Sequence, residues 1–397
     1  MWMSISFAMI KKDHFLILFS LFILVHVALF WNYGIREFMD SVAYIEGADY
    51  VIRHHELQDY HHLFYSVPIL IMATFRLLFP NDVVPILLFQ CLLSGLATVA
   101  LYKSAEKVFY SRLAGLMAGV IFLIWLDNIH WNITTMTESI ACSIFCFVVY
   151  VLANWQDRRK DIVRLVLALA LVFFTRPTGV VIIIGAFVFL IAYHREWLKE
   201  RLPVLISVAA IGIILIIFGA DRMLDHWNFT DQYLKGNIVT FADIVKDHRL
   251  YHETLTIEPP PSTSFVTSRS PIGRVISFIF ENPLYFLKTA GLKVFYLIAF
   301  VRPYYSWPHN LYLAVWIFSV YTFFVLGWRS TMNMPVKLFV LTAIVLNCGL
   351  IGISTVDWDN RFYIPMEPGI VLLAGGGAAN LIERIKTSKR RYPSSEM

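Results

Sequence analysis

Acidic and arginine side chains interrupt the apolar stretches of this sequence near their ends. The set comprises Asp40, Glu138, Arg176, Arg302, Asp357, Asp359 and Arg361. An ionised group beside lipid is costly, so these residues indicate a polar cavity rather than a simple membrane anchor. A carboxylate can serve as a general base, and guanidinium groups can stabilise the charge on a leaving phosphate. The sequence therefore predicts a polar chemical site at the ends of membrane-spanning segments.

The composition is that of an integral membrane protein. The 397 residues are 58% hydrophobic and only 15% charged, which is too apolar for a soluble globule with a polar surface. Apolar stretches of about 17 to 25 residues predict membrane spans. They lie at 14–31, 83–102, 112–128, 138–155, 202–219, 310–328, 336–353 and 366–382, and a shorter pair, 162–175 and 178–193, is split at Pro177. The net charge of +5 is concentrated in short loops, so we expect no nucleic-acid partner.

Lysine and arginine clusters in the short loops predict the orientation, because such clusters mark the cytoplasmic side. With these clusters inside, the segments 32–82, 128–138, 220–309 and 354–365 and the turn at Arg176 lie outside. The acids and arginines named above then share one face. This topology requires that 63–79 and 284–301, which prolines bracket, be interfacial or re-entrant helices. The alternative is two further crossings.

The first outer loop is rich in polar side chains. Asp40 is expected just before a helix that has Ala48 and Val51 on one face, where a carboxylate could also act as an N-cap. Further along, the loop carries Tyr44, His54, His55, His61 and His62. The histidines could bind zinc, but we expect solvated or acceptor-facing histidines instead. Because a cap needs only one polar residue, this loop is predicted to line a site.

Two further residues stand at helix ends on the same face. Glu138 opens a predicted span, where an acid would also complement the helix dipole. Arg176 lies between two half-length helices at membrane depth, and broken helices are tolerated there where they line protein or water. A guanidinium group in such a break suits a lipid phosphate.

The C-terminal part returns charged and aromatic residues to this face. Arg302 and Arg361 are cations of this part, and either could form a salt bridge with Asp357 or Asp359. The segment Asp357-Trp358-Asp359 has the pattern of a metal-binding acid pair. A hard cation prefers more oxygen ligands than this tight loop supplies, so we expect no metal and no cofactor.

Taken in order, these features resemble the GT-C superfamily of polyprenyl-phosphate-sugar glycosyltransferases. The most similar branch holds protein O-mannosyltransferases, aminoarabinose transferases and rhizobial lipopolysaccharide galacturonosyltransferases. The matching pieces are the first span followed by Asp40 and Tyr44, the segments 65–80 and 101–118, the Thr137-Glu138 pair and the turn 176–179. The resemblance covers residues 10–220 and extends more loosely beyond them.

This resemblance implies an all-α polytopic membrane protein, with a GT-C-type bundle of about 10–12 transmembrane helices. Interfacial helices are expected in the first outer loop. The implied organisation is an N-terminal transmembrane module at 1–220, whose catalytic first outer loop is 32–82, an outer loop at 221–282, and C-terminal transmembrane helices with a basic cytoplasmic tail at 283–397.

The implied activity is a transfer with inversion from a polyprenyl-phosphate sugar to a lipid, glycan or protein acceptor. It would take place at the periplasmic face of the bacterial inner membrane. By resemblance Asp40 is the catalytic base, and Glu138 helps to hold the acceptor or the loop. Arg176, Arg302 and Arg361 would bind the donor phosphate, and Tyr44, His54, His55, His61, His62 and Asp359 would contact the acceptor or sugar. Mannosyltransferases of the family have a second acid beside the first; here Glu37 is the nearest one preceding Asp40, which argues against a protein hydroxyl acceptor.

Two other functions fit the sequence. A transporter or lipid flippase also places charges in a helix bundle and breaks helices at its site, but it tends to show two related halves and midplane charges. A noncatalytic subunit could keep the scaffold without activity. An enzyme is expected to lose turnover on Asp40→Asn while still binding polyprenyl phosphate, whereas a transporter is not.

Overall fold

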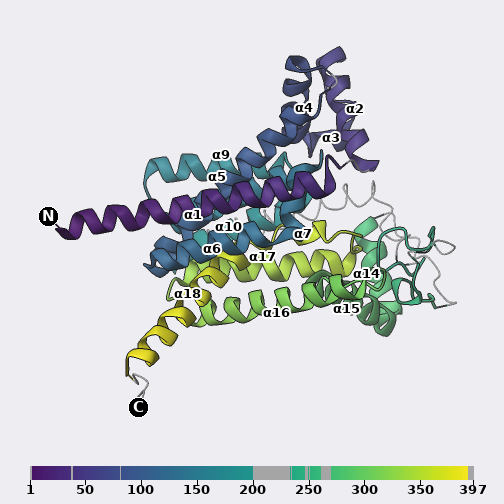
Figure 1. The fold of residues 1–397 in the computed structure, drawn as a ribbon. Helices are drawn as coiled ribbons and strands as arrows, with labels where there is room; N and C mark the ends of the chain where they lie inside the picture. The colour runs from purple at the N-terminus through teal and green to yellow at the C-terminus, as the bar shows by residue number, and fades with distance from the viewer. Residues whose placement is uncertain are drawn as a thin grey trace. The chain divides into compact units, whose positions relative to one another are not determined.

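The computed structural model describes residues 2–36, 39–80, 82–199, 233, 235–245, 249, 251–260 and 270–391. In these ranges the chain is helical, and its β pairing is limited to isolated bridges (Figure 1). The protein is thus an all-α polytopic membrane protein, as predicted. The predicted span 202–219 lies outside the described residues.

Four described helices are long and apolar enough to cross a bilayer. They are α1 (Trp2–Tyr33), through its part Asp13–Tyr33, α5 (Val84–Phe109), α16 (Trp307–Ser330) and α17 (Met334–Ile353). A fifth candidate is bent by 63° between α6 (Arg112–Ile124) and the segment Leu126–Ile133, which begins with α7 (Leu126–Ile129) and continues as the 3-10 turn η1 (His130–Ile133). The sequence predicted a single span over 112–128. The number of crossings, about 10–12 by resemblance, stays a prediction.

The chain forms two compact units, one comprising Met1–Phe189, Phe318–Ile344 and Ile364–Met397 (unit 1) and the other Leu190–Ile317 and Val345–Tyr363 (unit 2). The division expected from the sequence at residues 220 and 282 stays a prediction.

The core of unit 1 is formed by α5, α6, α8 (Glu138–Ala153) and α18 (Glu367–Arg391), which pack against one another. Small residues let α18 approach its neighbours closely. A Cβ atom built on Gly375 would lie 2.6 Å from the backbone nitrogen of Ala118, and one on Gly376 would overlap the ring of Phe109. The stretch from Ile370 to Ala374 is almost fully buried. This glycine run therefore permits the tight interior packing that a bulkier sequence would prevent.

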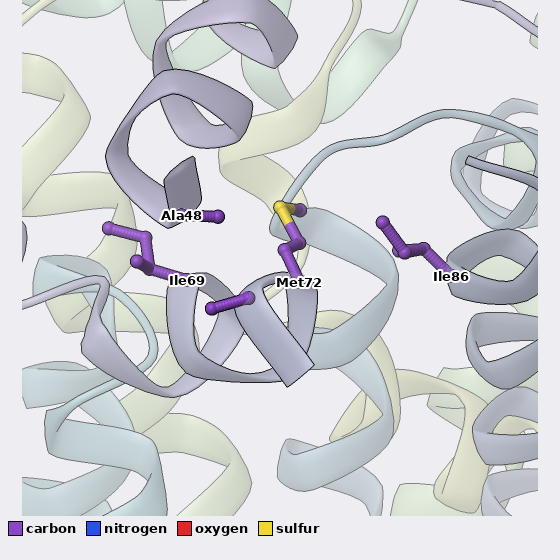
Figure 2. Packing of buried hydrophobic residues seen from close by; sticks show 5 residues of the cluster. Ala48, Ile69, Met72 and Ile86 are labelled. Atoms are coloured by element: carbon purple, nitrogen blue, oxygen red, sulfur yellow. The ribbon is translucent and has the colours of Figure 1, made fainter. Parts of the chain in front are cut away.

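The first outer loop folds into α2 (Met39–His54), α3 (Tyr60–Leu63) and α4 (Ser66–Leu78). Ala48 from α2 packs on Ile69 and Met72 from α4, with Ile86 of α5 beside them (Figure 2). These four side chains are fully buried. The predicted apolar face of the first helix is confirmed, and it fixes α2 against α4.

The predicted break at Pro177 is also present. The chain leaves α9 (Arg159–Phe173), passes through the short turn η2 (Pro177–Gly179) and continues as α10 (Val180–Tyr193). Proline at the first position of η2 has no backbone N–H that needs a partner, so it is compatible with a helix start. A Cβ atom on Gly179 would lie 2.8 Å from the carbonyl oxygen of Val172, so glycine is needed for this tight turn.

Unit 2 contains α14 (Pro271–Glu281) and α15 (Pro283–Ala299), with a loop that includes the turn η4 (Arg361–Tyr363). Val239 pairs with Val356 in an isolated parallel bridge. Lys293 of α15 is fully buried, with its Nζ atom 3.6 Å from the ring centroid of Tyr233. This ammonium nitrogen has no hydrogen-bond partner among the described residues.

Candidate functional site

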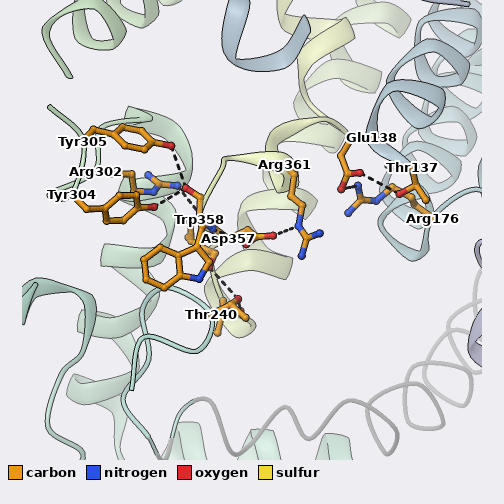
Figure 3. A network of polar contacts seen from close by, with 12 residues as sticks. Thr137, Glu138, Arg176, Thr240, Arg302, Tyr304, Tyr305, Asp357, Trp358 and Arg361 are labelled. Atoms are coloured by element: carbon orange, nitrogen blue, oxygen red, sulfur yellow. Dashed lines mark hydrogen bonds and ion pairs between the residues drawn. The ribbon is translucent and has the colours of Figure 1, made fainter. Parts of the chain in front are cut away.

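A buried ion pair joins two of the predicted site residues in unit 1. Arg176 Nη1 donates to Glu138 Oε1, and Thr137 Oγ1 donates to Glu138 Oε2 at 3.4 Å (Figure 3). Arg176 is 4% exposed and Glu138 is fully buried. Glu138 is the first residue of α8, whereas Arg176 lies in extended backbone at the break after α9. The helix start and the helix break therefore present opposite charges to each other.

The pair leaves part of the guanidinium group available. The Nε atom of Arg176 is buried and makes no hydrogen bond within the described residues. A guanidinium group has five N–H donors, so Arg176 could donate to a phosphate oxygen without displacing Glu138. Burial opposes the charge of Arg176, and the carboxylate of Glu138 supplies the counter-charge that favours it. The site is thus built to hold a positive charge.

The first outer loop is attached directly to this break. The backbone nitrogen of Val67, in the first turn of α4, donates to the carbonyl oxygen of Phe174 just after α9 at 3.0 Å. The ends of helices carry unpaired backbone groups, and here two ends satisfy each other. The rings of Phe64 and Phe173 meet edge to face at 5.6 Å. The loop is therefore held within reach of Arg176.

Tyr44 and Tyr65 lie between the attached loop and Arg176. Their ring centroids lie 5.4 Å apart, and both side chains lie in the neighbourhood of Arg176. His61 lies beside them, with its ring centroid 5.0 Å from that of Tyr65. The structure therefore brings predicted residues Tyr44 and His61 into the surroundings of Arg176.

The start of the loop meets the segment before Glu138. Arg36 pairs with Thr134 in a parallel bridge, and its backbone nitrogen donates to the carbonyl oxygen of Ile133 at 3.1 Å. Asp40 follows in the first turn of α2 and is half-buried. We expected it just before this helix; it lies inside, where an acid still complements the dipole. Its role as a base stays a prediction.

The other histidines of the loop have contacts away from the Tyr44–Tyr65 pair. His54 bonds through Nδ1 to the carbonyl oxygen of Tyr50 at 3.1 Å, and His55 ends α2 with a φ of 60°. His62 bonds to Asp59 at 2.9 Å, where Asp59 also caps α3. Among the described residues, no group of three or more His, Cys, Asp or Glu side chains is arranged to hold a metal ion. Contact of these histidines with a substrate stays a prediction.

The predicted residues of unit 2 form a separate polar network. Arg302 is 1% exposed and donates to the carbonyl oxygens of Tyr296 at 2.6 Å and Asp357 at 3.3 Å, and to the side chain of Asn360. Its guanidinium group therefore holds the loop at 357–360 in place. Arg361 pairs with Asp357, so one of the salt bridges that the sequence left open is present (Figure 3).

Aromatic hydroxyl groups complete this network. Tyr304 donates to the carbonyl oxygen of Trp358 at 2.6 Å, and Tyr305 donates to the same atom at 3.2 Å. Asp359, the predicted sugar contact, is the next residue and is half-buried. Hydrogen bonds hold the loop around Asp357, but binding of a phosphate or a sugar to it stays a prediction.

Sequence reasoning missed a buried acid, Glu367. It is the first residue of α18, and its Oε2 atom accepts from Cys142 Sγ at 3.4 Å. Cys142 lies one helical turn after Glu138 on α8. The available signal was an acid at the start of the predicted span 366–382, the same position that Glu138 occupies in its own span.

Sequence reasoning also missed a network of hydrogen bonds around Asn132, in the segment before Glu138. Asn132 is 3% exposed, and its side chain bonds to His26 Nε2 at 2.9 Å and to Ser139 Oγ at 2.5 Å. Asn132 begins one of two glycosylation sequons in the sequence, and its burial closes that sequon in the folded protein.

A comparison with known protein families matches the part of the chain that contains this ion pair. Residues 67–218 match the model of the dolichyl-phosphate-mannose-protein mannosyltransferase family. The match supports a GT-C-type membrane glycosyltransferase. It covers α4 to α10, and thus both Glu138 and Arg176, but less than half of the chain. No curated protein matches the sequence.

Proposed function

We propose that the protein transfers a sugar from a polyprenyl-phosphate donor to a lipid, glycan or protein acceptor. The proposed setting is the bacterial inner membrane, with the site facing the periplasm. The observation that carries this proposal is the buried Glu138–Arg176 pair, since it lies inside the matched segment and beside the docked first outer loop.

The proposed reaction is a single displacement. The oxygen of an acceptor hydroxyl attacks the anomeric carbon of the sugar, the bond from that carbon to the phosphate oxygen breaks, and the configuration inverts. Asp40 takes the proton of the hydroxyl, and polyprenyl phosphate leaves with the bonding electron pair. A base near the acceptor and a cation near the leaving group are the two groups that this step requires.

Arg176 is the proposed cation. Glu138 fixes its Nη1 atom, while Nε has no partner among the described residues and can donate to the leaving phosphate. A preorganised donor in a dry site stabilises developing charge more strongly than a mobile one. Tyr44 and His61 are the proposed contacts to the acceptor or sugar, because both lie with Tyr65 in the surroundings of Arg176.

Arg361 is a second proposed phosphate ligand, but it would share its charge with Asp357. Arg302 is proposed as a positioning residue for Asp357 and Asn360, since its donors already meet oxygen atoms of that loop. Removing Arg302 or Arg361 should therefore lower the rate of transfer by less than removing Arg176.

The test is release of labelled sugar from a panel of radiolabelled lipid-linked monosaccharides by the purified full chain. Asp40→Asn should abolish transfer while donor binding is retained, and Arg164→Gln is the control, because Arg164 is an exposed residue of α9 that pairs only with Asp161 in the described structure. Transport of an intact donor across a vesicle membrane without release of sugar would replace this proposal with a transporter or flippase.

A further inference from the structure

Glu367 is a buried acid that the proposed reaction does not use. It is fully buried in unit 1, and its Oε1 atom makes no hydrogen bond to any residue that the structure describes. Asn128 of α7 approaches the carboxyl group, but both polar atoms of its amide lack a completed hydrogen bond. Among the described residues Glu367 has no ion-pair partner, and the titratable groups that face it are Cys142 and Cys146 of α8.

The contrast with Glu138 is informative because the two acids occupy equivalent positions. Each begins a buried helix, and Cys142, the neighbour of Glu367, lies four residues after Glu138 on α8. Four residues correspond to a rise of about 6 Å along a helix. Glu138 has the guanidinium group of Arg176 as its counter-charge. Glu367 has two thiols and an amide.

The free energies of burial and of hydrogen bonding decide whether the carboxyl group of Glu367 is charged or neutral. Burying a carboxylate without a cation costs several kcal/mol, even after the protein relaxes around it. The N-terminus of α18 returns at most about 2 kcal/mol to an acid in its first turn. A thiol is a weak hydrogen-bond donor and recovers little of the difference. The neutral carboxylic acid, with one O–H donor, fits these surroundings better, because the amide oxygen of Asn128 can accept a hydrogen bond from that O–H group.

We propose that Glu367 is held as a neutral carboxylic acid that positions α7 and α8 through Asn128 and Cys142. It is a positioning residue for the site, and this part of the inference rests on the proposed function. The two buried acids then have opposite requirements. Glu138 must be charged to hold Arg176, whereas Glu367 must be uncharged and able to form hydrogen bonds.

The protonation state can be tested without any activity. Infrared spectra of the purified full chain at neutral pH should contain the carbonyl stretch of a protonated carboxylic acid, since the exposed acids are ionised there. The band should shift in D2O, remain in Glu138→Gln and disappear in Glu367→Gln. If the wild-type chain lacks the band, or if Glu367→Gln retains it, the proposal is wrong. Should Glu367→Gln fail to fold, ¹³C-labelled glutamate in the wild-type chain tests whether a glutamate gives the band, and a band that does not shift with the label would overturn the proposal.

The positioning role is tested by sugar release. Glu367→Gln keeps the shape and the hydrogen bonds of a neutral acid, so it should stay within about twofold of wild type with an unchanged pH profile. Glu367→Ala should lose about tenfold or more, because it leaves buried partners unsatisfied. A shifted pH profile in Glu367→Gln would mean that Glu367 titrates during the reaction and would overturn the proposal. If the wild-type chain releases no sugar, the proposed function fails, while the infrared result still decides the state of Glu367.

Discussion

Removing one member of the Glu138–Arg176 pair is the perturbation with the clearest expected size. Arg176 is 4% exposed, so Glu138→Gln would leave a guanidinium group buried without a counter-charge. Breaking a buried pair in this way costs about 3–5 kcal/mol in the free energy of unfolding. At 1.36 kcal/mol per factor of ten, this is about a hundredfold to several thousandfold in the unfolding equilibrium constant.

The double variant Glu138→Gln with Arg176→Gln distinguishes the cost of an unpaired buried charge from the cost of altered packing. It removes both ions and keeps two side chains that can bond to each other, so most of the lost stability should return. Asp49→Asn is the matched control, since Asp49 pairs with Arg76 but its side chain is 34% exposed. This pair is only partly buried, so its loss should cost less than that of the fully buried pair; fully exposed pairs contribute at most about 1 kcal/mol.

Denaturant unfolding in detergent, followed by tryptophan fluorescence, measures five proteins: the wild-type chain, Glu138→Gln, Arg176→Gln, the double variant and Asp49→Asn. The reasoning predicts that Glu138→Gln is much less stable than Asp49→Asn and that the double variant is more stable than Glu138→Gln. If the effects of the two single changes simply add in the double variant, the two groups are not coupled, and the site assigned to unit 1 would be refuted.

Three other outcomes follow from buried groups and close contacts. Lys293→Met removes a buried amino group that has no hydrogen bond in the described structure, so thermal unfolding should occur at the same or a higher temperature. A clear decrease would mean that the contact with the ring of Tyr233 stabilises the chain by more than burial of the amino group costs. Gly179→Ala brings a Cβ atom within 2.6 Å of Val172 and should destabilise the chain by about 1–3 kcal/mol, whereas Gly291→Ala, with open space, should not. Asn132 should stay unglycosylated on expression in eukaryotic cells, and a glycan found there by mass spectrometry would contradict its burial.

Much of the helical architecture could be predicted because the length of an apolar stretch and the positions of prolines determine a helix through residues that are near in sequence. The break at Pro177 and the buried face of α2 at Ala48 follow from residues that are near in sequence. The bend after α6 was missed, because no proline or glycine lies at Trp125, where the helix ends. Apolar length alone does not distinguish a straight span from a bent one.

The site was predicted by residue type but not by partner. Glu138 and Arg176 were each placed at a helix end, yet nothing in their spacing predicts that they pair, since a contact between distant segments depends on packing. Arg361 was open to either a phosphate or an acid, and the structure pairs it with Asp357. Glu367 was missed because an acid at a span boundary reads as a surface residue until the helix is known to be interior.

The glycine run of α18 has a consequence for synthesis in the cell. α5, α6 and α8 emerge from the ribosome long before α18, but their shared interface includes this later helix. Until it arrives, the surface that receives Gly375 and Gly376 is exposed to lipid or to other chains. Incomplete membrane proteins with such open surfaces are vulnerable to wrong association and degradation. Biogenesis of this protein should therefore depend on protection of the early helices until α18 has inserted.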